Sequence, residues 1–368
     1  MGLLGLSGCG SPSSASVEMS SQTELVKTGS MELQYAENFA VDYYEDGYKM
    51  LTTLPDSKRY LIVPEGQPVP RGLDEDVSIL QEPLQNIYLV ASGAMDMFAS
   101  LDAVDQIRFS GQKQENWYIQ TAKDAMAAGD MIYAGKYSKP DYELLVSEGC
   151  DLAIENRMIT HSPEVVEMLQ SFDIPVMIEY SSYEQHPLGK VEWVKFFGAL
   201  TGKEAEAEED FAEQTEILEE VESGEKTGKT IAFFYVTSNG LIQVRQSTDY
   251  IPKLIELAGG RYIFEDLEDS GSGRSTLNMQ IEDFYAGAKD ADILIYNSSI
   301  DGGVTTVDEL IGKCNILKDF KAVQEGQVYC TTNDMYQQSM AIGYLLQDMH
   351  TVLTDDDTAK LRYLFLLQ

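Results

Sequence analysis

Apolar residues recur at helical spacing, three, four or seven residues apart, between His186 and Val221. The periodic positions are Trp193, Phe197, Leu200, Phe211, Leu218 and Val221. Gly202 divides the stretch into two helical halves, and the second half carries acids at almost every position outside a narrow apolar stripe. This pattern predicts a largely solvated helix that connects other parts of the molecule and is not itself a core element.

Short β-branched runs alternate with helical patterns before this connector. The predicted strands are 86–92, 106–111, 131–135, 151–156 and 175–180. The predicted helices between them are 95–104, 121–128, 142–148 and 162–172. Strands that alternate with helices indicate crossover units and a mainly parallel sheet, in which ligands bind beyond the carboxyl ends of the strands.

A second block of the same kind follows the connector. Its predicted strands are 229–236, 261–264, 292–299 and 328–332, and its predicted helices are 249–258, 280–288 and 337–353. A short internal similarity links the blocks, because Glu143 precedes the run from Asp151 to Asn156 much as Glu282 precedes the run from Asp292 to Asn297. Two α/β lobes of like topology that face each other across a cleft are the simplest interpretation.

The segment before the first block is less regular. Residues 31–85 contain one clear strand, Tyr60 to Val63, and a Pro- and Gly-rich stretch at 64–76 that predicts turns and loops. We interpret 31–85 as an edge extension of an N-terminal lobe that spans 31–185. The connector helices then occupy 186–227 and the C-terminal lobe 228–368.

The first residues, 1–30, have the character of a lipoprotein signal remnant and a Ser-rich tether. Leu6-Ser7-Gly8-Cys9 resembles the bacterial lipobox, in which the cysteine becomes lipid-modified, and serines follow it directly. The segment lacks a basic n-region and has only a short apolar stretch before Cys9. The alternative is an N-terminal arm with a chance cysteine. If the lipobox holds, the protein works outside the cytoplasm, anchored to the cell membrane by lipid.

Composition narrows the classes of function. The 368 residues include 61 acids and 26 bases, a net charge of −35, which disfavours nucleic acid and anionic membrane surfaces as partners. The four cysteines (9, 150, 314 and 330) and the three histidines (161, 186 and 350) are scattered, so neither a disulfide framework nor a metal centre is indicated. We expect no resident cofactor, and no stretch after Cys9 is a transmembrane candidate.

From about Asn86 to the C-terminus the chain resembles a known family, the extracytoplasmic solute-binding proteins of ABC importers. The class is the one that carries ferric siderophores, haem and cobalamin. The resemblance rests on five segments in the correct order: NIYLVASGAMDMF, YELLVSEGCDLAIEN, HPLGKVEWVKFFGALTGK, YIPKLIELAGGRYIF and ILKDFKAVQEGQVY. It implies a class III periplasmic-binding-protein-like fold, in which two Rossmann-like α/β lobes are bridged by a single long helix.

The resemblance also implies a function and a partner. Such a protein, here a monomer without catalytic activity, captures an iron-siderophore type chelate and delivers it to a membrane permease with its ATPase. In the family one glutamate on each lobe docks onto permease arginines, and the matching positions are Glu143 and Glu282. The alternative is that both are ordinary solvated helix acids.

Ligand-binding candidates are the side chains at the ends of predicted strands, or in the loops after them, that face the expected cleft. They are Ser92, Trp117, Tyr137, Arg157, Tyr235, Asn239, Arg245, Asn297 and Tyr336. Aromatic planes with a few donors suit a bulky chelate, and arginines suit its carboxylates. Arg157 and Arg245 are favoured because arginines are scarce in this acidic chain. For any one aromatic residue, packing in the core is an equally good explanation.

Two alternatives to a siderophore receptor stay open. A haem or cobalamin receptor of the same class has the same sequence features. A cell-surface enzyme on a two-lobed scaffold is the other, but the chain has no GxSxG nucleophile motif, and the glycines at 271–273 lack the Lys-Ser/Thr of a phosphate-binding loop. Met95, Met97, Met335 and Met340 are best explained as core residues and not as soft metal ligands.

Overall fold

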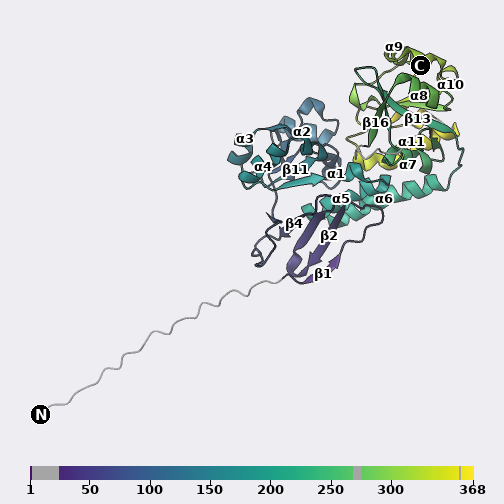
Figure 1. Cartoon of the computed structure of the whole chain (residues 1–368). Coiled ribbons are helices and arrows are strands. Elements are labelled where there is room, and N and C mark those ends of the chain that lie inside the picture. The colour runs from purple at the N-terminus through teal and green to yellow at the C-terminus, as the bar shows by residue number, and fades with distance from the viewer. Residues whose placement is uncertain (2–24, 268–274, 356–357) are drawn as a thin grey trace.

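The computed structural model describes residues 1, 25–267, 275–355 and 358–368. Cys9 lies outside the described residues. The chain forms two α/β lobes side by side, with a smaller N-terminal sheet and two helices, α5 and α6, along their common base (Figure 1). The expectation of two α/β lobes is confirmed.

The N-terminal lobe is built on an all-parallel sheet. Its strands are β6 (Ile87–Leu89), β7 (Ile107–Ser110), β8 (Ile132–Tyr133), β11 (Leu152–Asn156) and β12 (Val176–Glu179), in the order β12-β11-β6-β7-β8. Its helices are α1 (Ala94–Ser100), α2 (Gln120–Ala128), α3 (Tyr142–Ser147) and α4 (Pro163–Ser171). A two-strand hairpin, β9 (Gly135–Lys136) and β10 (Lys139–Pro140), follows β8. Every strand and helix predicted between residues 86 and 180 has a counterpart here.

The C-terminal lobe has a mixed sheet whose central strands are parallel. Its strands are β13 (Thr230–Val236), β14 (Ile242–Arg245), β15 (Arg261–Tyr262), β16 (Thr276–Met279), β17 (Ile293–Tyr296), β18 (Val328–Thr331) and β19 (Leu364–Leu366). The order is β16-β14-β13-β17-β18-β19, with β15 beside β13; β14, β16 and β19 join antiparallel. Its helices are α7 (Tyr250–Leu257), α8 (Ile281–Ala288), α9 (Val307–Lys313), α10 (Lys321–Gln324) and α11 (Ile342–Thr354).

The short sequence similarity between the lobes has a structural cause. Asp151, just before β11, accepts hydrogen bonds from the backbone N–H groups of Gln85 and Asn86 at the start of β6. Asp292, just before β17, accepts one from the backbone N–H of Thr230 at the start of β13. In each lobe, therefore, an aspartate just before one strand accepts hydrogen bonds from the backbone at the start of the neighbouring strand, the first strand of that lobe.

The N-terminal extension is a complete five-stranded sheet. Its strands run in the order β1 (Lys27–Ser30), β2 (Phe39–Tyr44), β3 (Lys49–Thr53), β4 (Lys58–Val63) and β5 (Val77–Gln81). Only β4 was predicted. Phe39 on one face meets the rings of Trp193 and Phe196 with centroids 4.9 and 5.3 Å away, so this sheet covers helix α5.

The connector forms the two helical halves that the sequence predicted, but the burial of the first half was not anticipated. It forms two helices, α5 (Pro187–Thr201) and α6 (Glu204–Glu222), joined where Gly202 adopts a left-handed conformation with φ 72°. A single long bridging helix is therefore not confirmed. All residues of α5 from Pro187 to Leu200 are buried, so this helix is a core element. Only α6 has the narrow buried stripe that the sequence indicated.

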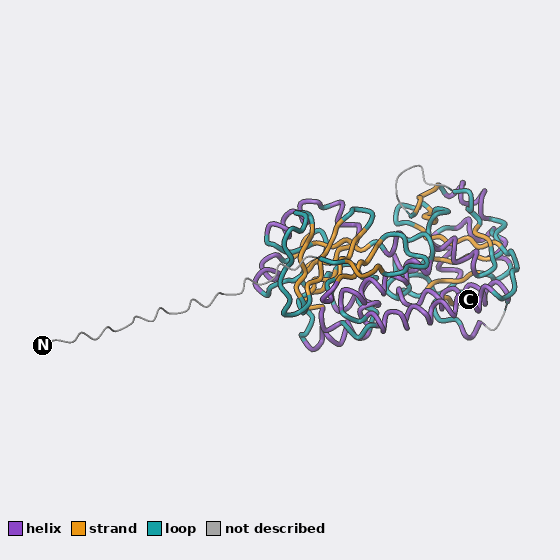
Figure 2. The backbone as a smooth tube through the Cα atoms, turned by 90° about the horizontal axis from the view of Figure 1, so that it is seen from below, coloured by secondary structure: helices purple, strands orange, loops and turns teal. Residues whose placement is uncertain are grey.

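Helix α6 runs antiparallel along α5 and then reaches the C-terminal lobe. Gly198 permits the close approach of the two helices, because a Cβ there would lie 2.6 Å from the Cβ of Ala207. Further along α6, the Gln214 side chain accepts a hydrogen bond from the backbone N–H of Gly343 in α11. Figure 2, a view from below, shows the strands of the molecule in two groups with helices around them.

One hydrophobic cluster crosses the boundary between the lobes. It includes Leu51 of the extension, Phe197 of α5, Leu254 of α7 and Leu346 of α11, all buried. A continuous packed core of this kind resists large changes in the angle between the lobes. Among the described residues, no helix is both long and apolar enough to cross a membrane.

Candidate functional site

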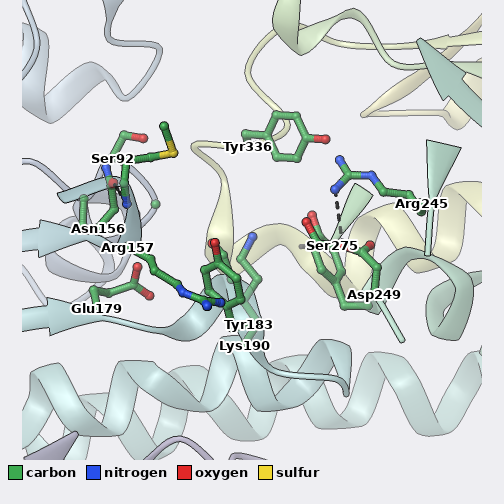
Figure 3. Close-up of a pocket in the computed structure, with 15 residues that line it drawn as sticks. Ser92, Asn156, Arg157, Glu179, Tyr183, Lys190, Arg245, Asp249, Ser275 and Tyr336 are labelled. Carbon is green, nitrogen blue, oxygen red and sulfur yellow. Dashed lines mark hydrogen bonds and ion pairs between the residues drawn. The ribbon is translucent and has the colours of Figure 1, made fainter. Parts of the chain in front are cut away.

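A pocket lies between the two lobes, above the first turn of α5 (Figure 3). The free space within it is about 780 Å³, a volume that includes open solvent at its mouth. Its walls come from the loops after strands of both lobes, as expected for ligand sites of parallel α/β sheets. The lining residues are Ala91, Ser92, Gly93, Asn156, Arg157, Met158, Glu179, Ser182, Tyr183, Lys190, Arg245, Asp249, Tyr250, Ser275 and Tyr336.

The wall on the N-terminal lobe follows the carboxyl ends of β6, β11 and β12. Asn156 ends β11, and its side chain accepts a hydrogen bond from the backbone N–H of Met158 at 2.9 Å, which fixes the turn that carries Arg157. The Arg157 guanidinium lies 4.4 Å from the centroid of the Tyr183 ring. Glu179 ends β12, accepts a hydrogen bond from the backbone N–H of Ser181 at 2.6 Å, and has its pKa raised by burial.

The wall on the C-terminal lobe centres on Arg245, the last residue of β14. Its guanidinium lies 3.3 Å from a carboxylate oxygen of Asp249 and 5.4 Å from the centroid of the Tyr336 ring. Asp249 also caps α7 by accepting a hydrogen bond from the backbone N–H of Ile251 at 2.9 Å. Burial raises the pKa of Asp249, and the charge of Arg245 acts against that rise.

The floor of the pocket is the start of α5. Lys190 projects from this helix, and its ammonium lies 4.8 Å from the centroid of the Tyr250 ring. Figure 3 shows Lys190 between the two walls, with Arg157 and Tyr183 on one side and Arg245 and Asp249 on the other. The site therefore presents one cationic side chain from each lobe and one from the connecting helix.

The structure brings five of the nine sequence candidates together. Ser92, Arg157, Arg245 and Tyr336 line the pocket. Asn297 lies behind this surface and donates a hydrogen bond from its side chain to the phenol oxygen of Tyr336 at 2.9 Å. Their roles in ligand binding stay predictions.

The other four candidates lie elsewhere. Trp117 is buried in the core and donates from Nε1 to the Ser110 hydroxyl at 3.0 Å. Tyr137 and Tyr235 pack against the hydrophobic clusters of their own lobes. Asn239 lies in the turn between β13 and β14, where its side chain accepts a hydrogen bond from the Thr237 hydroxyl. These four residues lie at or after strand ends in the sequence, but they do not line the pocket.

Sequence reasoning missed Lys190, Glu179, Asp249 and Tyr183. A lysine inside a mostly apolar helical run is the available signal for Lys190, since most lysines are exposed. Glu179 is the next-to-last residue of the predicted strand 175–180, so its position near a strand end is the available signal for it. Asp249 sits at a helix start, where a capping role is the first explanation.

The proposed docking acids occupy equivalent places on the two lobes. Glu143 lies in the first turn of α3 and Glu282 in the first turn of α8, and both are exposed. Figure 1 shows α3 and α8 on different lobes. Their docking role stays a prediction.

The described cysteines, and the methionines weighed above as metal ligands, are buried or partly buried. Cys314 and Cys330 are buried, and Cys150, Cys314 and Cys330 are all unpaired. Met95, Met97 and Met335 are buried among apolar residues, consistent with the interpretation as core residues. In the part of the chain that the structure describes, no group of three His, Cys, Asp or Glu side chains is placed to hold a metal ion.

No family model matches the chain. It is 24% identical over 351 residues to an uncharacterized lipoprotein of Methanocaldococcus jannaschii, an alignment that covers 87% of this chain and 81% of that protein. A second uncharacterized lipoprotein of the same organism is 24% identical over 323 residues, covering 84% and 79%. The first alignment is longer than residues 86–368, so it includes part of the N-terminal extension.

Solved structures with the same fold are periplasmic binding proteins. A possible iron-binding, periplasmic solute-binding protein from Staphylococcus epidermidis has a TM-score of 0.57 and 17% identity, covering 73% of this chain and 98% of that chain. The haem-binding protein HutB of Vibrio cholerae has a TM-score of 0.58 and 14% identity, with the same coverage. The petrobactin-binding protein YclQ from Bacillus subtilis has a TM-score of 0.56 and 12% identity, covering 73% and 92%. The chain thus has the class III periplasmic-binding-protein fold, as its sequence resemblance implied.

Proposed function

We propose that this protein is the solute-binding protein of an ABC importer and that it captures an iron-siderophore type chelate in the cleft between its lobes. The observation that carries the proposal is the position of the pocket. It lies where two lobes of the class III fold meet, and strand ends of both lobes line it. Solved proteins of this fold include receptors named for iron, haem and siderophore ligands.

The electrostatics of the pocket favour an anionic ligand. Arg157, Lys190 and Arg245 line it, although the whole chain has only 26 lysines and arginines against 61 acids. The two carboxylates in the lining, Glu179 and Asp249, both have their pKa raised by burial, which disfavours the charged form. A chelate with peripheral carboxylates would find charge-assisted donors on both walls.

A haem or cobalamin receptor is the second candidate. Haem-binding proteins are among the solved structures with this fold at comparable TM-scores. The pocket also offers the aromatic rings of Tyr183, Tyr250 and Tyr336, which suit a flat macrocycle. Either ligand would be bound and released without chemical change, because the mechanism is a difference in affinity between conformational states.

The partner in this proposal is a permease with its ATPase, which Glu143 and Glu282 contact. Two exposed carboxylates on separate lobes can orient a body with a net charge of −35 on a basic surface. We also propose that Cys9 carries a lipid anchor on the outer side of the membrane. The names of the two lipoprotein relatives support this assignment.

The test is a titration of the purified protein with ferric catecholate, ferric hydroxamate and ferric carboxylate siderophores, haem and cobalamin. Absorption of the metallated ligand and quenching of Trp117 and Trp193 fluorescence report binding. Saturable binding of a ferric chelate supports the siderophore proposal, and binding of haem or cobalamin alone selects the second candidate. Failure of all five ligand types to bind would overturn both.

A further inference from the structure

Two buried lysines on helix α5 have different surroundings. Lys190 is 2% exposed and Lys195 is 3% exposed. The ammonium of Lys195 lies 2.9 Å from a carboxylate oxygen of Glu208 and 3.5 Å from one of Glu192. Within the described residues, the Lys190 ammonium has no carboxylate within 4.0 Å and donates no hydrogen bond; its partner is the Tyr250 ring. One lysine is paired inside the protein, and the other faces the pocket.

Carboxylates near Lys190 are occupied by other donors. Asp96, Glu179 and Asp249 all lie close enough for the Lys190 charge to act against the rise in pKa that burial causes. Each accepts a backbone hydrogen bond, from Met340, Ser181 and Ile251 respectively, at 2.7, 2.6 and 2.9 Å. Because none reaches the ammonium, its N–H donors point to the space between the lobes (Figure 3).

A buried cation without an ion pair is costly unless a counter-charge is supplied. The two arginines of the pocket already have partners on their own walls, Tyr183 for Arg157 and Asp249 for Arg245. Lys190 lies at the floor of the pocket, so it would contact the part of a bound molecule that reaches deepest between the lobes. Its donors can then be satisfied by an anionic group of the ligand.

We propose that Lys190 is the anion-binding group of the cleft floor, and that the ligand inserts an oxyanion, a carboxylate or phosphate group, between the two lobes to reach it. The proposal rests on the proposed function only in taking the interlobe pocket as the ligand site. It adds a requirement on the ligand, since a neutral or cationic molecule would leave the ammonium unpaired.

The experiment is a calorimetric titration of the full chain with citrate and, separately, with inorganic phosphate, in chloride buffer at constant ionic strength. The wild type is expected to bind at least one of the two anions. Lys190→Met should lower that affinity by at least about tenfold, the loss typical of removing one partner of a desolvated charge pair. Lys190→Arg keeps the charge and should recover part of the affinity. The two titrations distinguish a carboxylate-type from a phosphate-type ligand.

Lys195→Met is the matched control, because Lys195 has the same burial on the same helix but its partners are Glu192 and Glu208. It should lower the melting temperature and leave anion affinity within about twofold of the wild type for the protein that stays folded, since it touches no pocket group. Lys190→Met should keep a melting temperature closer to that of the wild type. Binding of neither anion by the wild type, or equal affinity in Lys190→Met and the wild type, would overturn the proposal.

This experiment and the siderophore titration can fail independently. A protein that binds a ferric chelate but shows no Lys190-dependent anion binding is a chelate receptor whose floor lysine has a structural role. If the protein binds citrate or phosphate through Lys190 but none of the metallated ligands, the anion site is supported and the proposed ligand class is not.

Discussion

Buried charges in this protein differ in whether hydrogen bonds satisfy them. Glu192 in α5 is fully buried, yet its carboxylate accepts backbone hydrogen bonds from Gln34, Tyr35 and Ala36. Glu155 in β11 is equally buried, and among the described residues neither of its carboxylate oxygens has a hydrogen-bond partner. Burial alone raises the pKa of Glu155 to about 8. The first carboxylate organises the backbone, whereas the second is a source of instability when it ionises.

Glu155→Gln tests that difference through pH. Since the folded pKa is about 8 and the usual value is 4.5, stability from this group is present below pH 4.5 and is lost as the pH rises toward 8. The free energy of unfolding of the wild type should fall relative to Glu155→Gln by at least about 1 kcal/mol between pH 5 and pH 8. Urea denaturation across that range measures it, and a pH-independent difference would show that Glu155 is not the group responsible.

Arg245→Ala tests the cleft wall. The Arg245 side chain is largely buried beside Asp249, so its loss should weaken binding of the cognate chelate by about 2 to 5 kcal/mol. Titration of the identified ligand measures the loss, and Arg157→Ala should also weaken binding, from the opposite wall. Arg108→Ala is the control, because Arg108 pairs with Glu148 on the lobe surface away from the pocket. Unchanged affinity in both pocket variants would place the site elsewhere.

Sequence reasoning identified the pocket arginines but not the lysine between them. Arg157 could be predicted because it follows a recognisable apolar strand, and Arg245 because it lies in the predicted loop before the helix at 249–258; arginine is also scarce in the chain. Lys190 lies in a helix whose apolar pattern continues on all sides, and the pattern cannot show that the ammonium faces a cavity instead of solvent. Trp117 was chosen for its position after a strand, and a position in the sequence does not show on which side of the loop the ring packs.

At the scale of elements, helix α5 depends on the sheet that precedes the N-terminal lobe. The α5 helix is buried on every side because the sheet of β1 to β5 covers the face that an isolated lobe would leave to solvent. Glu192 ties the chain between β1 and β2 to the helix by its backbone hydrogen bonds. The helix predicted to be solvated is α6, and the burial of α5 was not anticipated because residues 31–85 were not recognised as strands.

The strands of that sheet could not be read reliably from their sequence. Strand β2, FAVDYY, mixes an acid with aromatic residues on a partly exposed face, and β1, KTGS, is exposed throughout. Strand β4 was predicted from the continuous apolar run at 60–63. Both faces of that run are buried: Tyr60 and Ile62 belong to the main hydrophobic cluster, and Leu61 and Val63 belong to a smaller one with Leu73 of the loop between β4 and β5. Regular alternation in the two lobes, by contrast, made their strands and helices predictable.

Glu192→Ala tests the dependence of helix α5 on the N-terminal sheet. It removes a fully buried carboxylate that accepts three backbone N–H groups and leaves those donors unsatisfied, a loss of about 3 to 5 kcal/mol in the free energy of unfolding. Glu208→Ala is the matched control, because Glu208 pairs with the same Lys195 but is 60% exposed, and it should cost less than about 1 kcal/mol. Equal losses in chemical denaturation would contradict a special role for Glu192.

At the scale of the whole molecule, the lobes are joined by more than the base helices. Gln337 of the C-terminal lobe accepts a hydrogen bond from the backbone N–H of Tyr118 and donates one to the backbone oxygen of Asn116 in the other lobe, both at 2.8 Å. The backbone N–H of Met340 donates to Asp96 in α1 at 2.7 Å. With the shared core, these contacts favour a small closure on ligand binding over a wide hinge motion.

The lipid anchor can be tested on the full chain. If Cys9 is the lipidated residue, Cys9→Ser should move the protein from the membrane fraction into the medium or periplasm, because no described helix can hold it in the bilayer. Cell fractionation with immunodetection measures this. A variant that stays with the membrane would show that the attachment lies elsewhere.

Docking on the permease is the property that belongs to the molecule as a whole, because it requires both lobes in a fixed relation. Glu143→Ala combined with Glu282→Ala should abolish ligand uptake while leaving ligand affinity intact, since both acids are exposed and outside the pocket. The control is Glu167→Ala with Glu325→Ala, which removes one exposed acid from each lobe at other sites and so makes the same change in net charge.

Uptake of the radiolabelled ligand in cells that lack the native copy, together with titration of each purified variant, separates the outcomes. Loss of uptake in the Glu143 and Glu282 variant alone would identify two specific contacts that orient the body. Equal loss in both double variants would mean that the net charge of −35 steers the encounter without specific contacts. Unimpaired uptake, or weakened ligand binding in the Glu143 and Glu282 variant, would remove these residues from the docking surface.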